Sequence, residues 1–152
     1  MITFQVETLS QCLDEIELLL QDHFEEVSTN KEKLGGPNMD IGTYVARELA
    51  GGLHIVTARE EGEVVGYYVA FVNPHLHYAH SLTALTDVYY LAPHVRKGAN
   101  GIRLFKEAER TLKKRGVQRI FSGTKLHKDV GKLFEFLGWT ETERLFVKWI
   151  GD

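Results

Sequence analysis

The sequence of 152 residues has little cysteine, no long apolar stretch and no excess of positive charge. Its one cysteine, Cys12, excludes an internal disulfide, so nothing indicates an oxidising compartment and the cytoplasm is the expected location. No apolar run approaches the roughly 20 residues of a membrane span, and the start of the chain lacks the form of a secretion signal. The net charge of −3 argues against a general nucleic-acid binder.

The remaining composition is that of an ordinary globular protein, with 43% hydrophobic and 26% charged residues, so we expect one domain over residues 1–152. Apolar patterns predict strands over residues 2–7, 53–59, 63–72, 82–91, 117–122 and 140–150. They predict helices after Ser10, from Ile41, from Ile102 and over residues 128–137, with loops over 25–39 and 73–81. This mixture predicts an α/β domain.

The segment from Thr86 to Glu109 carries the clearest functional pattern. A strand closed by Pro93 is followed by a loop of mostly small residues and then by an amphipathic helix. Such a loop lets a ligand approach the backbone, and a helix start offers unpaired N–H groups to an anion such as phosphate. The alternative is a plain connector, and the loop lacks the patterns of a Walker loop and of a dinucleotide site.

This segment resembles the acyl-CoA binding loop of the GNAT superfamily of N-acetyltransferases, whose pattern is Arg or Gln, two residues, Gly, one residue, then Gly or Ala. Arg96 and Gly101 take the outer positions, Ala99 stands where the first glycine is expected, and Gly98 lies one residue early. The resemblance implies that the loop amides hold the pyrophosphate of acetyl-CoA, the acyl donor. It also implies that the end of the preceding strand, at Leu91, pairs with the pantetheine arm.

The segment LHKDVGKLFEFLGW resembles the second GNAT signature, which is commonly Asn, two residues, Ala, three residues, Tyr, three residues and Gly-Phe. Aligned on Gly138 and Trp139, the family asparagine becomes His127, the alanine becomes Val130 and the tyrosine becomes Phe134. The resemblance covers nearly the whole chain, and it is strongest between the core strand and this segment.

Phe134 is the departure that matters most, because the family tyrosine often protonates the departing thiolate and a phenyl ring has no proton to give. The thiolate then leaves unassisted, takes a proton from water or from a hydroxyl such as that of Tyr89 or Tyr90, or the protein binds the cofactor without turnover. The resemblance implies these cofactor-binding residues: Tyr90, Leu91, Arg96, Lys97, Gly98, Ala99, Asn100, Gly101, Ile102, His127 and Phe134.

Asp87 is the one ionisable carboxylate on the predicted core strand, where burying it unpaired would be costly. The resemblance gives it the role of general base, and a structural role is the alternative. His75, His77 and His80 lie in the preceding loop. They fit a solvated loop, a zinc site or the lining of an acceptor cleft, with His77 as the reserve base. No metal is expected, because GNAT enzymes need none.

The resemblance implies the GNAT fold, with a mixed central sheet of six to seven strands and helices on both faces. It implies an N-acetyltransferase of bacterial or phage type that transfers acetyl from acetyl-CoA to a small-molecule or protein amine, by direct attack in a ternary complex. The region between the first two strands would lie over the acceptor, and a homodimer is compatible.

Two other classes remain. A non-catalytic GNAT-fold binding protein is favoured by Phe134, Ala99 and His127. A nucleic-acid binder would use residues 96–119, with nine Lys or Arg, which otherwise steer an anionic cofactor or form a solvated face.

Overall fold

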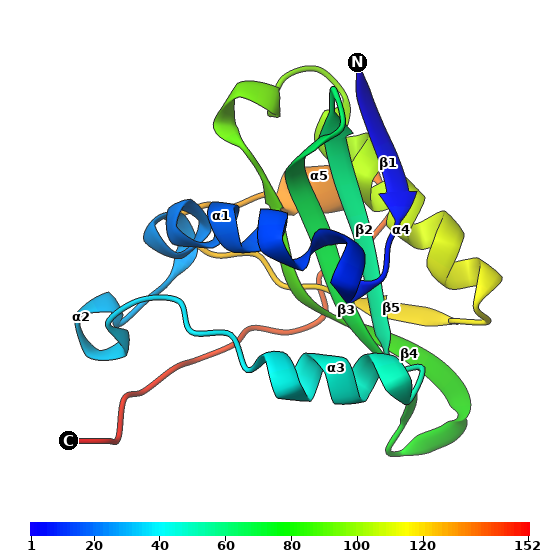
Figure 1. The fold of residues 1–152 in the computed structure, drawn as a ribbon. Helices are drawn as coiled ribbons and strands as arrows, with labels where there is room; N and C mark the ends of the chain where they lie inside the picture. Colours follow the sequence, from blue (N-terminus) through cyan, green and yellow to red (C-terminus); the bar gives the residue numbers. More distant parts are fainter.

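A five-stranded sheet forms the centre of the computed structural model, which describes residues 1–152 (Figure 1). Its strands are β1 (Ile2–Val6), β2 (Leu53–Glu60), β3 (Glu63–His75), β4 (Tyr78–Leu91) and β5 (Arg119–Phe121), and they lie side by side in chain order. The first four are antiparallel to their neighbours, whereas β5 is parallel to β4. A parallel neighbour needs a crossover connection, and a helix supplies it here.

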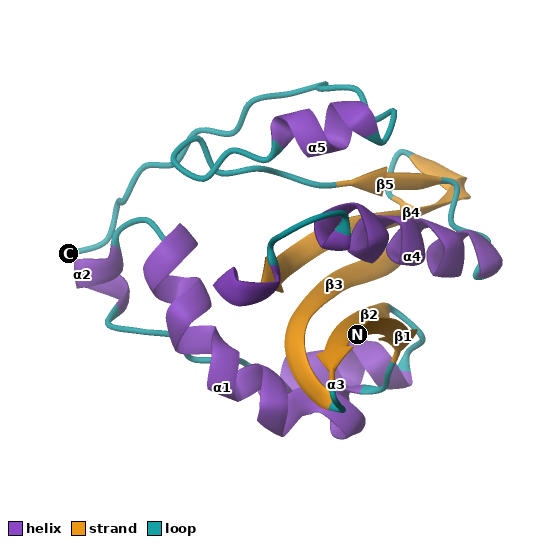
Figure 2. Cartoon of the chain, turned by 90° about the horizontal axis from the view of Figure 1, so that it is seen from above, coloured by secondary structure: helices purple, strands orange, loops and turns teal.

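Helices cover both faces of this sheet (Figure 2). They are α1 (Leu9–Val27), α2 (Lys31–Leu34), α3 (Ile41–Leu49), α4 (Asn100–Lys114) and α5 (Gly131–Phe136), with a 3-10 turn η1 (Pro93–Val95) before α4. One core cluster joins Cys12 and Ile16 of α1 to the sheet, and a second joins Leu104 of α4 and Phe134 of α5 to the opposite face. The predicted α/β class with helices on both faces is confirmed. None of the helices combines the length and apolarity that a bilayer span requires.

The ladder between β3 and β4 is interrupted at Asp87. Val69 lies opposite Val88 and Ala70 lies opposite Thr86, so Asp87 is an extra residue on β4, in a β-bulge. A bulge resets the alternation of side chains between the two faces. As a result Asp87 and Val88 both face the α1 side of the sheet.

The prediction of a last strand over residues 140–150 is wrong, and with it the count of six to seven strands. Leu145 and Val147 alternate as strand residues do, but no strand edge pairs with this segment, and its apolar side chains lie in solvent, with Phe146 94% exposed. An alternating pattern forms a strand only where a neighbouring edge supplies hydrogen bonds.

Both predicted loops are shorter than expected. The first, over residues 25–39, contains the end of α1 and the short helix α2. The second, over residues 73–81, is almost entirely strand, since β3 runs to His75 and β4 begins at Tyr78. Pro74 and the polar neighbours suggested a loop, but the hairpin continues through them.

Gly66 on β3 lies opposite Leu91, where a Cβ atom would come within 2.5 Å of both Leu91 Cδ2 and the Tyr90 carbonyl oxygen. We expect Gly66→Ala to lower the free energy of unfolding by about 1–3 kcal/mol, because the backbone of β4 would have to move. Gly123→Ala is the control, since a Cβ there meets nothing within 4 Å. Urea unfolding measures both, and equal midpoints would contradict the close approach of the two strands.

Candidate functional site

The edge of β4 that faces β5 is free along much of its length. β5 pairs with β4 only from Thr83 to Leu85, so the strand from Thr86 onward has no neighbour on that side (Figure 2). Just beyond β5, the Ser122 hydroxyl is buried and has no hydrogen-bond partner. Tyr89 reaches across, and its hydroxyl donates to the Gly123 carbonyl at 2.7 Å. An extended ligand with amide groups would find unpaired partners along this edge.

The loop after β4 presents a row of unused donors. No backbone N–H from Lys97 to Ile102 finds an acceptor in the protein, and Gly98 takes a left-handed conformation with φ of +63°. The Asn100 side chain holds the loop by donating to the Val95 carbonyl at 3.0 Å. Successive free N–H groups at the start of a fifteen-residue helix have the geometry to bind an anion, because the helix dipole adds partial positive charge.

Arg96 organises this loop from within the protein. Its Nε donates to the Leu91 carbonyl, and its two terminal nitrogens donate to the Glu26 carboxylate, all at 2.6 Å. The guanidinium also lies 5.2 Å from the centre of the Tyr90 ring. Arg96 therefore fixes where the chain leaves β4, at Leu91, the residue expected beside the pantetheine arm.

Glu26, near the end of α1, also contacts the segment after β5. Its carbonyl lies 3.2 Å from His127 Nε2, and its carboxylate lies 3.8 Å from Lys128 Nζ. The hydrogen bonds from Arg96 lower the pKa of Glu26 below its ordinary value, so the carboxylate stays charged. One acidic residue thus ties α1 to the loop before α4 and to the segment before α5.

Asp87 has one close partner on the opposite layer. The Tyr44 hydroxyl of α3 donates a hydrogen bond to the Asp87 carboxylate. Burial, with a further effect from Asp87, raises the pKa of Tyr44 well above its ordinary value, so the tyrosine remains a donor at neutral pH. The bulge and Tyr44 together fix a carboxylate on the α1 side of β4.

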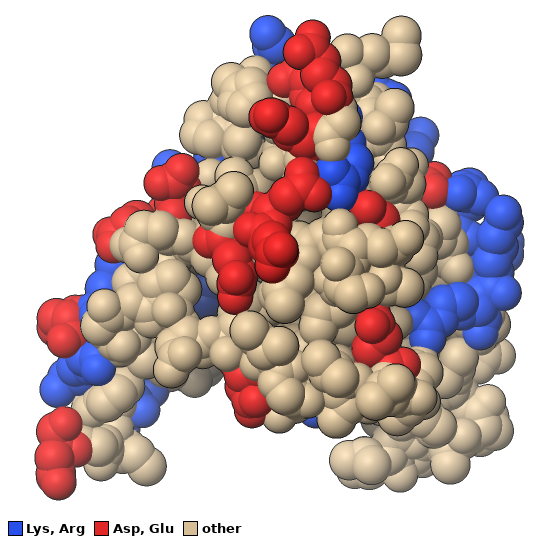
Figure 3. Space-filling model, in the orientation of Figure 1, with Lys and Arg blue, Asp and Glu red and all other residues tan.

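Surface charge is unevenly divided (Figure 3). Lys and Arg gather over α4, and Asp and Glu gather over α1 and the turn between β2 and β3. Helix α1 contains no Lys or Arg. Its acidic residues are Asp14, Glu15, Glu17, Asp22, Glu25 and Glu26.

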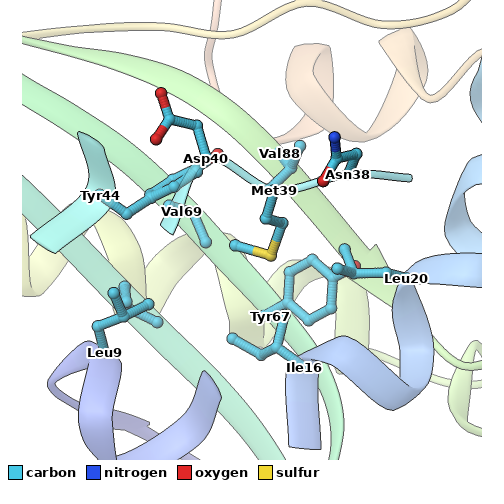
Figure 4. Close-up of a pocket in the computed structure, with 11 residues that line it drawn as sticks. Leu9, Ile16, Leu20, Asn38, Met39, Asp40, Tyr44, Tyr67, Val69 and Val88 are labelled. Atoms are coloured by element: carbon cyan, nitrogen blue, oxygen red, sulfur yellow. The ribbon is translucent and has the colours of Figure 1, made fainter. Parts of the chain in front are cut away.

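A cavity of about 370 Å³ lies between α1 and the sheet, beside Tyr44 (Figure 4). It is lined from α1 by Leu9, Ile16 and Leu20, from the segment before α3 by Asn38, Met39 and Asp40, from α3 by Tyr44, and from the sheet by Ile55, Tyr67, Val69 and Val88. Nine of these eleven residues are hydrophobic. The cavity therefore suits an apolar group.

The structure brings some predicted site residues together and separates others. Asp87, Tyr90 and the loop after β4 lie along one end of β4, whereas His77 lies in the turn at its other end. Ten residues of strand at about 3.3 Å each place His77 roughly 30 Å from Asp87, too far to share its acceptor. Phe134 is buried in an aromatic cluster, and its ring stacks on Trp139 with centroids 5.0 Å apart.

Three contributors were missed by the sequence analysis: Tyr44, Glu26 and Ser122. Tyr44 lies in the helix predicted from Ile41, and no local signal in the sequence links it to a carboxylate 43 positions away. Of the three loop histidines, His75 and His77 pack beside each other with ring centroids 5.6 Å apart.

A sequence profile described as the acetyltransferase (GNAT) family matches residues 15–139, most of the chain. The sequence matches none of the curated proteins with which it was compared.

Solved structures of similar fold cover the whole chain at low identity. An aminoglycoside acetyltransferase, HMB0005, from an uncultured soil metagenomic sample has a TM-score of 0.75 at 16% identity, with 99% of each chain covered. The ribosomal-protein-alanine N-acetyltransferase of Brucella melitensis has a TM-score of 0.72 at 14% identity, covering 99% of this chain and 100% of that one. AAC(6')-Iy in complex with the bisubstrate analogue CoA-S-monomethyl-acetylneamine has a TM-score of 0.71 at 15% identity, covering 100% and 99%. At these identities the likeness shows the fold.

His23 joins α1 to the sheet behind the cavity. Its Nδ1 lies 2.7 Å from the Tyr67 hydroxyl, and its ring stacks on Tyr90 at 4.9 Å. Burial lowers the pKa of His23 to about 4, while Glu26 raises it and Arg96 lowers it by smaller amounts. The imidazole is therefore neutral at pH 7.

Because the folded-state pKa of His23 lies below the unfolded value of 6.5, the unfolded chain binds an extra proton between pH 6.5 and 4. Stability should fall as the pH drops through this window, by about 2 kcal/mol from pH 7 to 5 for this one histidine. Urea unfolding at the two pH values measures the loss. His23→Gln should show a smaller loss, and the exposed His80→Gln should behave like the wild type. An unchanged loss in His23→Gln would contradict the assignment.

Proposed function

Because the chain belongs to the acetyltransferase (GNAT) family, whose members are acyl-CoA-dependent N-acetyltransferases, we propose that it transfers the acetyl group of acetyl-CoA to an amine by direct attack in a ternary complex. The row of free N–H groups from Lys97 to Ile102 carries this proposal. This row would bind an anion, and it lies at the position where the family pattern predicts the pyrophosphate. The free edge of β4 and the unpartnered Ser122 hydroxyl fit the amide groups of pantetheine.

Asp87 is proposed as the general base. It would accept a proton from the acceptor ammonium, directly or through water, and the freed amine nitrogen would attack the thioester carbon. The carbon–sulfur bond breaks and the acetyl group stays on nitrogen. The nitrogen loses its second proton as the amide forms, and this loss balances the proton that the thiolate takes up. Holding the two reactants together and polarising the carbonyl with backbone N–H groups would supply most of the acceleration. Tyr44 is a positioning residue, because it acts through the Asp87 carboxylate.

Tyr89 is proposed to supply the proton that Phe134 cannot. Both rings lie on the α4 side of the sheet, with centroids 6.1 Å apart, and the Tyr89 hydroxyl reaches the segment after β5. Burial raises the pKa of Tyr89, which keeps its hydroxyl protonated at neutral pH. Tyr90 lies on the α1 face against His23, away from the free strand edge.

The rival function is a GNAT-fold binding protein that holds the cofactor without turnover. The observation that favours it is the aromatic cluster around Phe134, which leaves the family tyrosine position without a hydroxyl. The rival shares acetyl-CoA binding with the enzyme but predicts no release of thiol with any amine.

Acetyl-CoA should raise the thermal midpoint of the purified protein. A ligand that binds only the folded state adds roughly 2.7 kcal/mol at a hundred times its dissociation constant. Dephospho-CoA and desulfo-CoA show which part of the ligand is recognised. Gly98→Val should weaken the effect, because a β-branched residue is strained at a φ of +63°. Gly116→Val is the matched control, since it is equally strained at a φ of +86° but lies at the opposite end of α4, and it should not change the shift. An unchanged thermal midpoint at saturating acetyl-CoA would contradict the acetyltransferase proposal.

Asp87→Asn should lower kcat by about 10²–10⁴-fold, the usual contribution of a general base, and leave the affinity for acetyl-CoA nearly unchanged. Asp14→Asn makes the same chemical change at an exposed position on α1 and should leave kcat unchanged. Tyr44→Phe should lower kcat less than Asp87→Asn, because the carboxylate remains. Steady-state release of the CoA thiol measures all three. Wild-type turnover by Asp87→Asn would assign the carboxylate a structural role.

A further inference from the structure

The cavity between α1 and the sheet narrows the class of acceptor. We propose that the acceptor is a primary amine carried on an apolar aliphatic or aromatic body, which fills this cavity while its ammonium group lies at the Tyr44–Asp87 pair. The inference rests on the proposed function, because it takes Asp87 as the base that meets the amine.

The cavity lies next to that pair. Tyr44 lines it and donates to Asp87, and Val88, the residue after Asp87, lines it from the sheet. Because the bulge turns Asp87 and Val88 to the same face, a ligand against Val88 lies beside the carboxylate. Figure 4 shows Met39 and Tyr67 pointing into the same space from opposite sides.

The polar groups around the cavity are already engaged within the protein. The Tyr67 hydroxyl is bonded to His23 at 2.7 Å, and the Tyr44 hydroxyl is bonded to Asp87. The Asp40 carboxylate accepts from the Thr43 backbone N–H at 3.0 Å and from the Thr43 hydroxyl at 2.6 Å. Asn38 makes no side-chain hydrogen bond and Asp40 can accept more than the two it has, but both are exposed, and the rest of the lining is apolar or already hydrogen-bonded. Ligand hydroxyls would lose their water partners here without replacement, whereas apolar atoms gain from burial.

Charge and size point the same way. Three acidic residues of α1 are paired with Arg or Lys from other segments, whereas Asp14, Glu17 and Asp22 have no such partner. With Asp40 and Asp87, these unpaired carboxylates make this side of the molecule attractive to a cation (Figure 3). A volume of about 370 Å³ is near the lower end of ligand pockets, which span roughly 300–1,000 Å³. One apolar group of modest size fits, whereas a polyhydroxylated polycation such as the aminoglycosides named for similar structures does not match the lining.

The test compares four amines as acceptors with wild-type protein and acetyl-CoA: hexylamine, 2-phenylethylamine, glucosamine and sisomicin. We expect kcat/KM for thiol release to be at least about tenfold higher for the two apolar amines, because small differences in a hydrophobic pocket give factors of this order. Calorimetric titration of the same amines into the protein measures binding separately from turnover.

Leu20→Gln and Leu18→Gln form a matched pair on α1. Leu20 lines the cavity, whereas Leu18 is 80% exposed. Leu20→Gln should lower kcat/KM and the affinity for the apolar amines about tenfold while leaving the acetyl-CoA affinity unchanged, and Leu18→Gln should match the wild type.

Preferred turnover of glucosamine or sisomicin would overturn the inference and leave the acetyltransferase proposal intact. Apolar amines that bind Leu20→Gln and the wild type equally well would also overturn it, whether or not they are turned over. If apolar amines neither bind nor react while acetyl-CoA binds, the inference fails. If acetyl-CoA itself does not bind, the proposed function fails instead.

Discussion

At Asp87 the ladder between β3 and β4 contains one extra residue on β4. This bulge determines which side chains face the two halves of the candidate site, the cavity on the α1 side and the free strand edge on the α4 side. Thr86 faces α4 and meets Tyr68, with hydroxyls 3.0 Å apart, while Asp87 and Val88 both face α1. Tyr89 then returns to the α4 side. Without the extra residue, every side chain after it would change face, since the strand period is two. The bulge therefore places a carboxylate next to two residues that line the cavity, Tyr44 and Val88, and a tyrosine hydroxyl near the free strand edge.

The two halves are joined by charge. Glu26 lies in the last turn of α1, the helix that forms one wall of the cavity. Its carboxylate accepts from Arg96, in the loop before α4, and its carbonyl lies next to His127. The side chain of Glu26 is only 18% exposed, so solvent screens this pair less than a surface ion pair. Arg96, the first residue of the family's phosphate-loop pattern, thus has a structural role. Its side chain fixes the loop, and the backbone N–H groups that follow remain free for the ligand.

The sequence predicted what depends on neighbours along the chain. The strand, small-residue loop and helix around Arg96 could be identified because their signals lie within a short segment, and they led to the family. Contacts across the fold were not accessible in this way. The pairing of Tyr44 with Asp87 depends on a bulge, and a bulge depends on the register of two strands, which alternation alone does not determine. The prediction of a strand over residues 140–150 failed for a related reason, since a strand requires a partner edge.

The cavity could not be predicted from the sequence, for a different reason. Leu9, Ile16 and Leu20 have the spacing of a helix stripe that packs on a sheet, and the same stripe forms either a filled core or the wall of a pocket. Whether a core or a pocket results depends on whether the side chains opposite the stripe are long enough to contact it. Here the layer above Tyr67 is formed partly by residues 38–40, which belong to no helix or strand, and Met39 enters the space as a flexible side chain.

Phe134 shows how a departure from a family pattern can be consistent with the fold. Its ring meets Phe105 at 5.0 Å and Trp139 at 5.0 Å, so the position serves the packing of α5 against α4. A hydroxyl on that buried ring would need a partner in an aromatic surrounding. Tyr89, on the same face, has its hydroxyl satisfied by the Gly123 carbonyl at the free edge of β4. The packing role and the hydroxyl are thus divided between two rings, one on the helix and one on the strand.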